Sequence, residues 1–239
     1  MTRKKILVCG KGKWGKKVIK QLKKLSNTIK IIDTKTYFKK IDLTDIDWVF
    51  VLTPNNTHFR LVSYFLSKKK NVFCEKPLTQ SLLKTKYLVK LAKTNKCKLY
   101  ISDIEIYKNK RIKKTKKLYV VRKKYSSGST KEILYRLAYH DIYLLENYLR
   151  PIDSIKILKI EKKNRLELKL EQKKISVFFD YDLNSKIKKH CINNQNFLHF
   201  RGNPLNKMVF KILNNRVNFI KNQNTAVFCN KLINKILKS

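Results

Sequence analysis

Acidic residues are scarce in this sequence. Its 239 residues include 16 Asp and Glu against 57 Lys and Arg, which gives a formal net charge of +41. Such an excess attracts nucleic acid or an anionic membrane surface. However, lysine outnumbers arginine, and the lysines are spread through every segment instead of forming one tract. We therefore expect most of this charge to be a solvated surface, and we expect no specific nucleic-acid binding.

Long apolar runs and paired cysteines are also missing. No stretch approaches the roughly 20 apolar residues of a membrane-spanning helix. The first residues run directly into a short strand-like segment, without the apolar core of a signal peptide. The five cysteines are scattered, and none forms a CxxC pair. These absences predict no membrane partner, no metal site, and free thiols in a cytoplasmic protein.

The first hundred residues alternate strand-like and helix-like segments. This alternation is typical of a parallel sheet with helices packed on it. We expect strands at residues 5–9, 28–32, 48–52, 71–74 and 98–102, and helices at residues 14–25, 57–66 and 81–92. Residues 1–103 are therefore predicted to form an α/β domain of the Rossmann type, with a doubly wound parallel sheet.

The pattern changes after residue 103. A helix is expected at residues 139–149 and a last one at 226–237, with strands between them at 155–160, 165–171, 175–181 and 186–192. Consecutive strands with short connections favour antiparallel pairing. Residues 104–239 are therefore predicted to form a smaller α+β domain with a mainly antiparallel sheet.

Glycine is rare, yet three of the five glycines fall in one short segment, Gly10-Lys11-Gly12-Lys13-Trp14-Gly15, between the first strand and the first helix. In a GxGxxG turn, the first glycine permits the bend and the second lets backbone approach a pyrophosphate. The third lets the helix pack closely on the strand. The helix N-terminus then offers free N–H groups to the phosphates. We expect Gly10, Gly12, Lys13, Trp14 and Gly15 to bind a dinucleotide; a structural turn without a ligand is the alternative.

Asp33 follows the second strand. An acidic residue at this point accepts hydrogen bonds from the adenosine ribose hydroxyls and repels a 2′-phosphate. The position favours NAD as the cofactor. Lys35 lies close enough to weaken this preference, so NADP stays open, and a simple turn or helix cap is the alternative for Asp33.

Polar segments also follow the third and fourth strands, where open α/β sheets face their ligands. The first is Thr53-Pro54-Asn55-Asn56-Thr57-His58 and the second is Glu75-Lys76-Pro77. Taken as isolated residues, these positions have a purely structural interpretation. Thr57 would be an N-cap, His58 a first-turn surface residue, and Lys76 a solvated lysine. The functional interpretation is cofactor binding by Thr53, Pro54, Asn55, His58, Glu75 and Lys76.

In combination these segments resemble the Gfo/Idh/MocA oxidoreductases. The most specific block is Val72-Phe73-Cys74-Glu75-Lys76-Pro77-Leu78-Thr79. The resemblance continues through Tyr139-His140-Asp141-Ile142-Tyr143-Leu144-Leu145, which is similar to the family's histidine-bearing helix, and through Asn203-Pro204-Leu205. It therefore covers essentially the whole chain.

This resemblance implies an NAD(P)-dependent enzyme that transfers a hydride between nicotinamide and a sugar, nucleotide sugar or polyol. Lys76 would contact the reacting hydroxyl and the cofactor, and His140 would act as general acid/base or orient the substrate. The family commonly forms dimers or tetramers through the open face of the second sheet. Residues 165–171 and 175–181 alternate apolar and polar side chains, as such a sheet requires, although the positive charge opposes self-association.

The departures from the family pattern concern the second domain, which is shorter than usual. Arg136 stands where an acidic residue usually precedes the histidine by one helical turn, and Tyr143 replaces another acidic residue. Arg136 would bind a carboxylate or phosphate on the substrate, or it marks a site that has lost its proton-transfer pair. Three hypotheses follow: an active oxidoreductase, with C=N reduction as a variant; a cofactor-binding sensor or assembly partner; and a nonspecific nucleic-acid binder.

Overall fold

Two sheets organise the chain in the computed structural model, which describes residues 3–25, 28–33, 38–113 and 115–239. The residues divide into two units: Met1–Tyr107 with Asn203–Val227, and Lys108–Gly202 with Phe228–Ser239. The sequence pattern suggests one boundary near residue 103. In the structure the first unit ends slightly later, and it also contains a segment from near the C-terminus.

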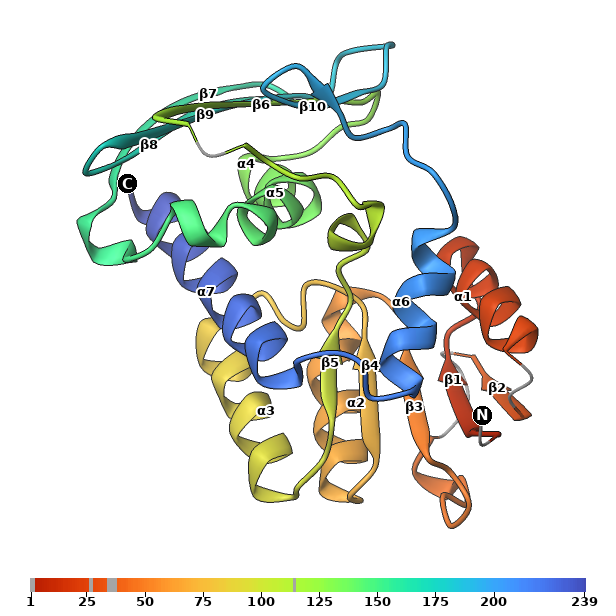
Figure 1. The fold of residues 1–239 in the computed structure, drawn as a ribbon. Helices are drawn as coiled ribbons and strands as arrows, with labels where there is room; N and C mark the ends of the chain where they lie inside the picture. Colours follow the sequence, from red (N-terminus) through yellow and green to blue (C-terminus); the bar gives the residue numbers. More distant parts are fainter. Residues whose placement is uncertain (1–2, 26–27, 34–37, 114) are drawn as a thin grey trace. The chain divides into compact units, whose positions relative to one another are not determined.

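Unit 1 contains a parallel sheet of five short strands in the order β2-β1-β3-β4-β5 (Figure 1). The order reverses between β1 and β3, and open α/β sheets bind ligands at such a switch point. The strands are β1 (Lys5–Cys9), β2 (Thr28–Ile32), β3 (Trp48–Val51), β4 (Asn71–Cys74) and β5 (Leu99–Ile101).

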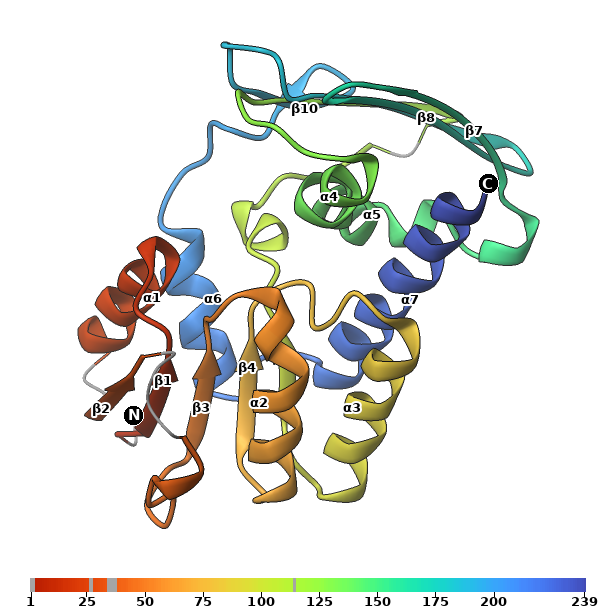
Figure 2. The ribbon, with the colours of Figure 1, turned by 180° about the vertical axis from the view of Figure 1, so that it is seen from behind.

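Helices cover both faces of this sheet. On one face lie α1 (Lys13–Lys24) and α6 (Pro204–Leu213), and on the other lie α2 (Asn55–Ser67) and α3 (Leu82–Thr94), which Figure 2 shows from behind. Because the central strands are buried on both sides, they read as continuous apolar runs. The predicted doubly wound parallel sheet is confirmed.

The segment Asn203–Val227 belongs to unit 1 because α6 buries its apolar side against β1 and β3. Met208, Val209 and Ile212 are fully buried in the same cluster as Ile6 and Phe50. The start of α7 (Phe219–Lys238) adds hydrogen bonds to the sheet edge, since the Asn222 side chain accepts from the Ile101 N–H and donates to its carbonyl, both at 2.8 Å.

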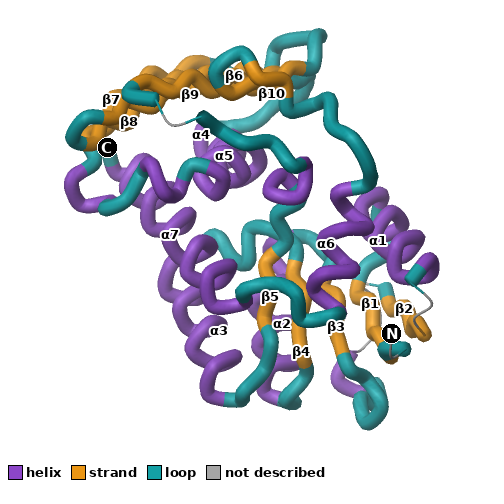
Figure 3. The backbone as a smooth tube through the Cα atoms, in the orientation of Figure 1, coloured by secondary structure: helices purple, strands orange, loops and turns teal. Residues whose placement is uncertain are grey.

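Unit 2 contains a second sheet in the order β11-β10-β6-β9-β8-β7 (Figure 3). Its pairs are antiparallel except for β6 with β9, so the prediction of a mainly antiparallel sheet is confirmed. The strands are β6 (Lys117–Lys123), β7 (Lys156–Lys162), β8 (Arg165–Gln172), β9 (Ile175–Asp182), β10 (Lys189–Ile192) and β11 (Gln195–Asn196).

One face of this second sheet packs on helices. These are α4 (Thr130–Ile133), a π-helix η3 (Leu134–Ala138), α5 (Tyr139–Leu144) and the end of α7. The helix expected at residues 139–149 begins at Tyr139 as α5 does, but α5 ends at Leu144, and the helical residues before it were not expected. Helical structure begins at Thr130, because Ser129 and Glu132 form a capping box. It passes into the short 3-10 turn η4 (Glu146–Tyr148) after α5.

Further 3-10 turns connect the main elements at η1 (Phe38–Lys40), η2 (Glu105–Lys108) and η5 (Ile152–Ser154). Within the described ranges, no helix is long and apolar enough to cross a membrane. The same ranges hold no cluster of His, Cys, Asp and Glu side chains suited to a metal ion. All five cysteines are free thiols.

Candidate functional site

The turn after β1 is one that only glycine can form. Gly10 has φ of 103°, and a Cβ added there would lie 2.8 Å from the Leu52 carbonyl oxygen. A Cβ on Gly15 would lie 2.5 Å from the Gly10 carbonyl oxygen. The first glycine therefore makes the bend, and the third allows α1 to pack directly on the turn.

Gly12 differs from the other two glycines because a Cβ there would meet nothing within 4 Å. Its backbone is the N-cap of α1, with no side-chain cap and no acidic residue in the first turn. The first N–H groups of a helix have no partner inside it, and they carry the positive end of the helix dipole. Open space above uncapped N–H groups fits a pyrophosphate, with Lys13 exposed beside it.

Asp33 lies immediately after β2, at the same carboxyl edge of the sheet as the glycine turn, and is partly exposed. Lys11 Nζ lies 4.0 Å from Asp33 Oδ2. Both side chains are solvent-accessible, so this pair neutralises the carboxylate only weakly. The Lys35 side chain, expected to weaken the preference for NAD, lies outside the described residues.

His58 links the segments that follow β3 and β4. Its ring is buried, with Nδ1 2.9 Å from the Pro77 carbonyl oxygen and Nε2 2.9 Å from the Thr53 carbonyl oxygen. The interpretation of His58 as a first-turn surface residue is therefore wrong. Since both ring nitrogens contact backbone, His58 holds these two segments in place beneath the ligand edge.

Thr57 is not the N-cap of α2, because Pro54 occupies that position and the helix begins at Asn55. The Thr57 hydroxyl donates to the Pro54 carbonyl at 2.7 Å and lies 2.6 Å from the Thr53 hydroxyl. Pro54 and Asn55 are exposed at the carboxyl end of β3. These contacts give the turn after β3 a fixed shape.

Glu75 connects β4 to the glycine turn. Its Oε1 accepts a hydrogen bond from the Trp14 indole Nε1, and its Oε2 accepts from the Lys76 N–H at 3.3 Å. Burial raises the pKa of Glu75, although hydrogen bonds from Ser102 and Trp14 and the charge of Lys76 act in the opposite direction. The Glu75 carboxylate therefore joins α1 to β4, with the partly exposed Lys76 next to it.

Arg136 and His140 lie in unit 2, whereas Lys76 lies in unit 1. Arg136 Nη1 donates to the Ser127 carbonyl at 2.9 Å, and Nη2 donates to the Ser126 hydroxyl at 2.8 Å. Arg136 is part of the π-helix, whose hydrogen bonds join residues i and i+5. His140 follows four residues later, in α5.

A buried polar network lies directly beside His140. Asp141 Oδ1 is 2.9 Å from His190 Nε2 and 3.1 Å from Arg122 Nη2, while its Oδ2 accepts from the Tyr181 hydroxyl at 3.2 Å. Burial alone would raise the pKa of Asp141, but Arg122 and His190 together lower it. The network ties α5 to the middle of the sheet.

The sequence pattern did not predict this network. The one available signal is in β6, where the buried positions Leu118 and Val120 are followed at the same spacing by Arg122. A charged residue in a buried strand position requires a partner. The partners of Arg122 depend on which strands pair with β6. Because β10 and β9 flank β6, they bring His190 and Tyr181 to Arg122.

Part of the chain matches a known family by sequence. Residues 27–102 match the Gfo/Idh/MocA family model, whose description is "Oxidoreductase family, NAD-binding Rossmann fold". A segment of 55 residues is 40% identical to the uncharacterized oxidoreductase YgjR of Escherichia coli (strain K12). This segment covers 23% of the chain and only 17% of YgjR.

The whole chain has the fold of solved dehydrogenases. UDP-N-acetylglucosamine 3-dehydrogenase GnnA from Acidithiobacillus ferrooxidans gives a TM-score of 0.81 at 12% identity, covering 99% of this chain and 97% of that one. The WlbA dehydrogenase from Bordetella pertussis, solved with NADH and UDP-GlcNAcA, gives 0.77 at 11% identity, covering 100% and 96%. Residues 27–102 are therefore similar in sequence to the NAD-binding Rossmann fold of the Gfo/Idh/MocA oxidoreductases, and the whole chain has the fold of these two dehydrogenases.

Proposed function

We propose that the chain is an NAD-dependent oxidoreductase that transfers a hydride between nicotinamide and a carbon of a sugar, nucleotide sugar or polyol. The glycine turn is the observation that carries this proposal. Gly10 and Gly15 leave no room for a Cβ, whereas the space above Gly12 is open. A turn that served packing alone would have no need of that open space at the N-terminus of α1.

The preference for NAD rests on Asp33. Its carboxylate accepts hydrogen bonds from ribose hydroxyls and repels the 2′-phosphate of NADP. Lys11, at 4.0 Å, reduces that repulsion only in part because both side chains are exposed to solvent.

The chemistry follows from Lys76 and His140. When bound, the nicotinamide accepts or supplies the hydride. The Lys76 ammonium donates a hydrogen bond to the reacting hydroxyl and favours its oxyanion form. His140 takes the hydroxyl proton or returns it, since an imidazole titrates near neutral pH. The names of GnnA and WlbA support a nucleotide sugar within the proposed substrate class.

Turnover of sugars, polyols and nucleotide sugars with NAD tests this proposal. Lys76→Met and His140→Ala should each lower kcat about a hundredfold or more, because each removes a proton-transfer or charge-stabilising group. NADH affinity should stay within a few-fold in His140→Ala, whereas Lys76→Met should also weaken NADH binding because Lys76 is expected to contact the cofactor. Lys86→Met, at an exposed position of α3, is the matched control and should keep full activity. Wild-type turnover by Lys76→Met would refute the assignment.

A cofactor-binding relative without turnover is the second candidate, and the Arg136 contacts favour it. An arginine held by Ser126 and Ser127 cannot assist His140 as a carboxylate would. Tight NADH binding without turnover of any of the tested sugars, polyols and nucleotide sugars would support this candidate. If Arg136 instead binds an acidic substrate, Arg136→Ala should selectively reduce the activity on acidic substrates. An equal change for acidic and neutral substrates would exclude that role.

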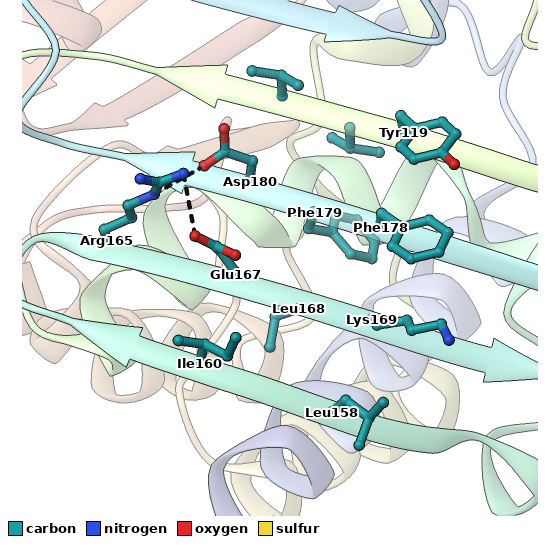
Figure 4. A pocket seen from close by; sticks show the side chains of 12 residues that line it. Tyr119, Leu158, Ile160, Arg165, Glu167, Leu168, Lys169, Phe178, Phe179 and Asp180 are labelled. Atoms are coloured by element: carbon teal, nitrogen blue, oxygen red, sulfur yellow. Dashed lines mark ion pairs between the residues drawn. The ribbon is translucent and has the colours of Figure 1, made fainter.

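We also propose that unit 2 forms a homodimer or tetramer through the outer face of its sheet. A hollow of about 410 Å³ lies on this face, and Figure 4 shows the side chains that line it. Tyr119 stacks there on Phe178, with ring centroids 4.9 Å apart. Leu158 and Ile160 are 60% and 56% exposed beside it. Exposed apolar side chains on the uncovered face of a sheet fit a second copy of the same face.

Local charge pairing removes the main objection to this interface. Although the whole chain carries +41, Arg165 on this face lies 3.1 Å from Glu167 and 3.3 Å from Asp180. Repulsion between two such faces is therefore much smaller than the total charge suggests. Sedimentation should show oligomers that Leu158→Lys dissociates, with Lys188→Glu, an exposed lysine that does not line this hollow, as the control. Monomers at high protein concentration would contradict the interface.

A further inference from the structure

A second hollow in unit 2 lies where two segments distant in the sequence come together. It has a volume of about 550 Å³ and is lined by Lys108, Asn109, Lys110, His199, Phe200 and Arg201. Sites for small molecules and cofactors typically enclose about 300–1,000 Å³. The hollow is therefore large enough for a nucleotide-sized ligand.

Its lining is strongly positive. Lys108, Lys110 and Arg201 carry fixed charge, and Asn109 and His199 add groups that can donate hydrogen bonds. Within the described part of the chain, neither Lys110 nor Arg201 has a carboxylate partner. Uncompensated cations around one concave surface favour an anion, and the planar guanidinium of arginine matches phosphate oxygens in particular.

An aromatic ring lies next to these cations in a fixed position. Lys108 Nζ donates to the Phe197 carbonyl at 2.9 Å and lies 5.1 Å from the centre of the Phe200 ring. Lys108 is almost fully buried, whereas Phe200 is 40% exposed. The lysine thus holds the ring by a cation–π contact while part of the ring surface stays accessible. A flat apolar surface beside phosphate-binding cations suits a nucleobase.

We propose that this hollow binds a nucleoside diphosphate group, with Arg201 and Lys110 on the phosphates and Phe200 stacked on the base. The inference rests on the proposed function, because it assigns a nucleotide sugar as the substrate whose diphosphate is held here. The same chemistry would also recognise a free nucleoside diphosphate. The hollow has room for one nucleotide, which favours a small ligand over a nucleic-acid strand.

Calorimetric titration of the full chain at physiological salt, without cofactor, provides the test. UDP should bind more tightly than inorganic pyrophosphate or uridine. Arg201→Gln and Lys110→Gln should each weaken UDP and pyrophosphate about tenfold or more, since each removes a charge-assisted hydrogen bond. Phe200→Leu should weaken the binding of UDP and leave the affinity for pyrophosphate unchanged. Lys188→Gln, an exposed lysine between β9 and β10, is the matched control for nonspecific attraction by a basic protein.

The outcomes separate this inference from the proposed function. UDP affinity that is unchanged in Arg201→Gln and Lys110→Gln, or equally reduced by Lys188→Gln, overturns the site. Binding of a single-stranded oligonucleotide through Arg201, with none of UDP, overturns it in favour of nucleic acid. NADH binding is measured independently, so its failure alone counts against the oxidoreductase.

Kinetics then distinguish the two sources of the diphosphate. If the ligand is a nucleotide sugar, Arg201→Gln should raise KM for a UDP-sugar about tenfold while kcat and the KM for a free sugar stay unchanged. UDP binding that leaves the KM for the UDP-sugar unchanged in Arg201→Gln supports the site for a free nucleoside diphosphate and overturns its substrate role.

Discussion

Replacing Asp141 by asparagine should strongly destabilise unit 2. The Asp141 carboxylate is completely buried and lies 3.1 Å from the guanidinium of Arg122, which is 8% exposed. Asparagine keeps the size of the side chain and removes its charge, so the buried guanidinium loses the counter-charge of Asp141. Breaking one side of a buried ion pair costs about 3–5 kcal/mol, and we expect Asp141→Asn to lower the free energy of unfolding by about that amount.

Urea unfolding followed by circular dichroism measures this loss, and Asp153→Asn is the matched control. Asp153 pairs with Lys231 at 2.9 Å, but its side chain is 83% exposed. An exposed pair contributes little because water and salt screen it. The same substitution at two ion pairs of similar length therefore isolates the effect of burial. Equal losses in the two variants would show that burial does not set the cost of breaking the Asp141–Arg122 pair.

The pH dependence provides a second measurement on the same residue. In the folded chain Arg122 and His190 outweigh the effect of burial and lower the pKa of Asp141. Between its folded and unfolded pKa values, the unfolded chain binds more protons, so stability rises with pH in that window. The contribution is complete above the unfolded pKa and is lost as pH falls through the folded pKa. Asp141→Asn should remove this part of the acid dependence.

Two further predictions concern unit 1. Gly15→Ala should lower the free energy of unfolding by about 1–3 kcal/mol, because its Cβ would lie 2.5 Å from the Gly10 carbonyl oxygen. Gly12→Ala should leave thermal unfolding nearly unchanged, because a Cβ there meets nothing within 4 Å, but it should weaken NADH binding. Similar melting curves for both variants would contradict this. Because burial raises the pKa of Glu75, Trp14 fluorescence should titrate above the ordinary range of a glutamate, and Glu75→Gln should abolish that step.

Most elements of unit 1 could be predicted because their physical cause is local. Strands buried on both faces appear as apolar runs, and the glycine turn fixes where β1 ends and α1 begins. The fourth strand is predicted at its observed bounds, Asn71–Cys74. By contrast, β6 begins and ends with lysine, and α6 packs on a sheet formed by residues far away in the sequence, so neither was predicted.

Some features of the candidate site could also be predicted from local sequence, and others could not. The turns after β1, β3 and β4 were predicted from motifs that specify backbone geometry. The burial of His58 was not, since it depends on two carbonyl groups from separate segments. The π-helix before His140 was also unexpected, because the sequence around Arg136 has ordinary helical composition. The roles of Lys76 and His140 remain predictions.

Calorimetric titration with NADH and then NADPH at physiological salt tests whether the chain is an NAD-dependent enzyme, with Asp33→Ala as the comparison. We expect the wild-type chain to bind NADH more tightly than NADPH. Asp33→Ala should weaken NADH binding, because the ribose hydroxyls of NADH lose a hydrogen-bond acceptor. It should also reduce the difference in affinity between NADH and NADPH, because the 2′-phosphate of NADPH is no longer repelled by a carboxylate. A folded chain that binds neither nucleotide would contradict the proposal of an NAD-dependent oxidoreductase.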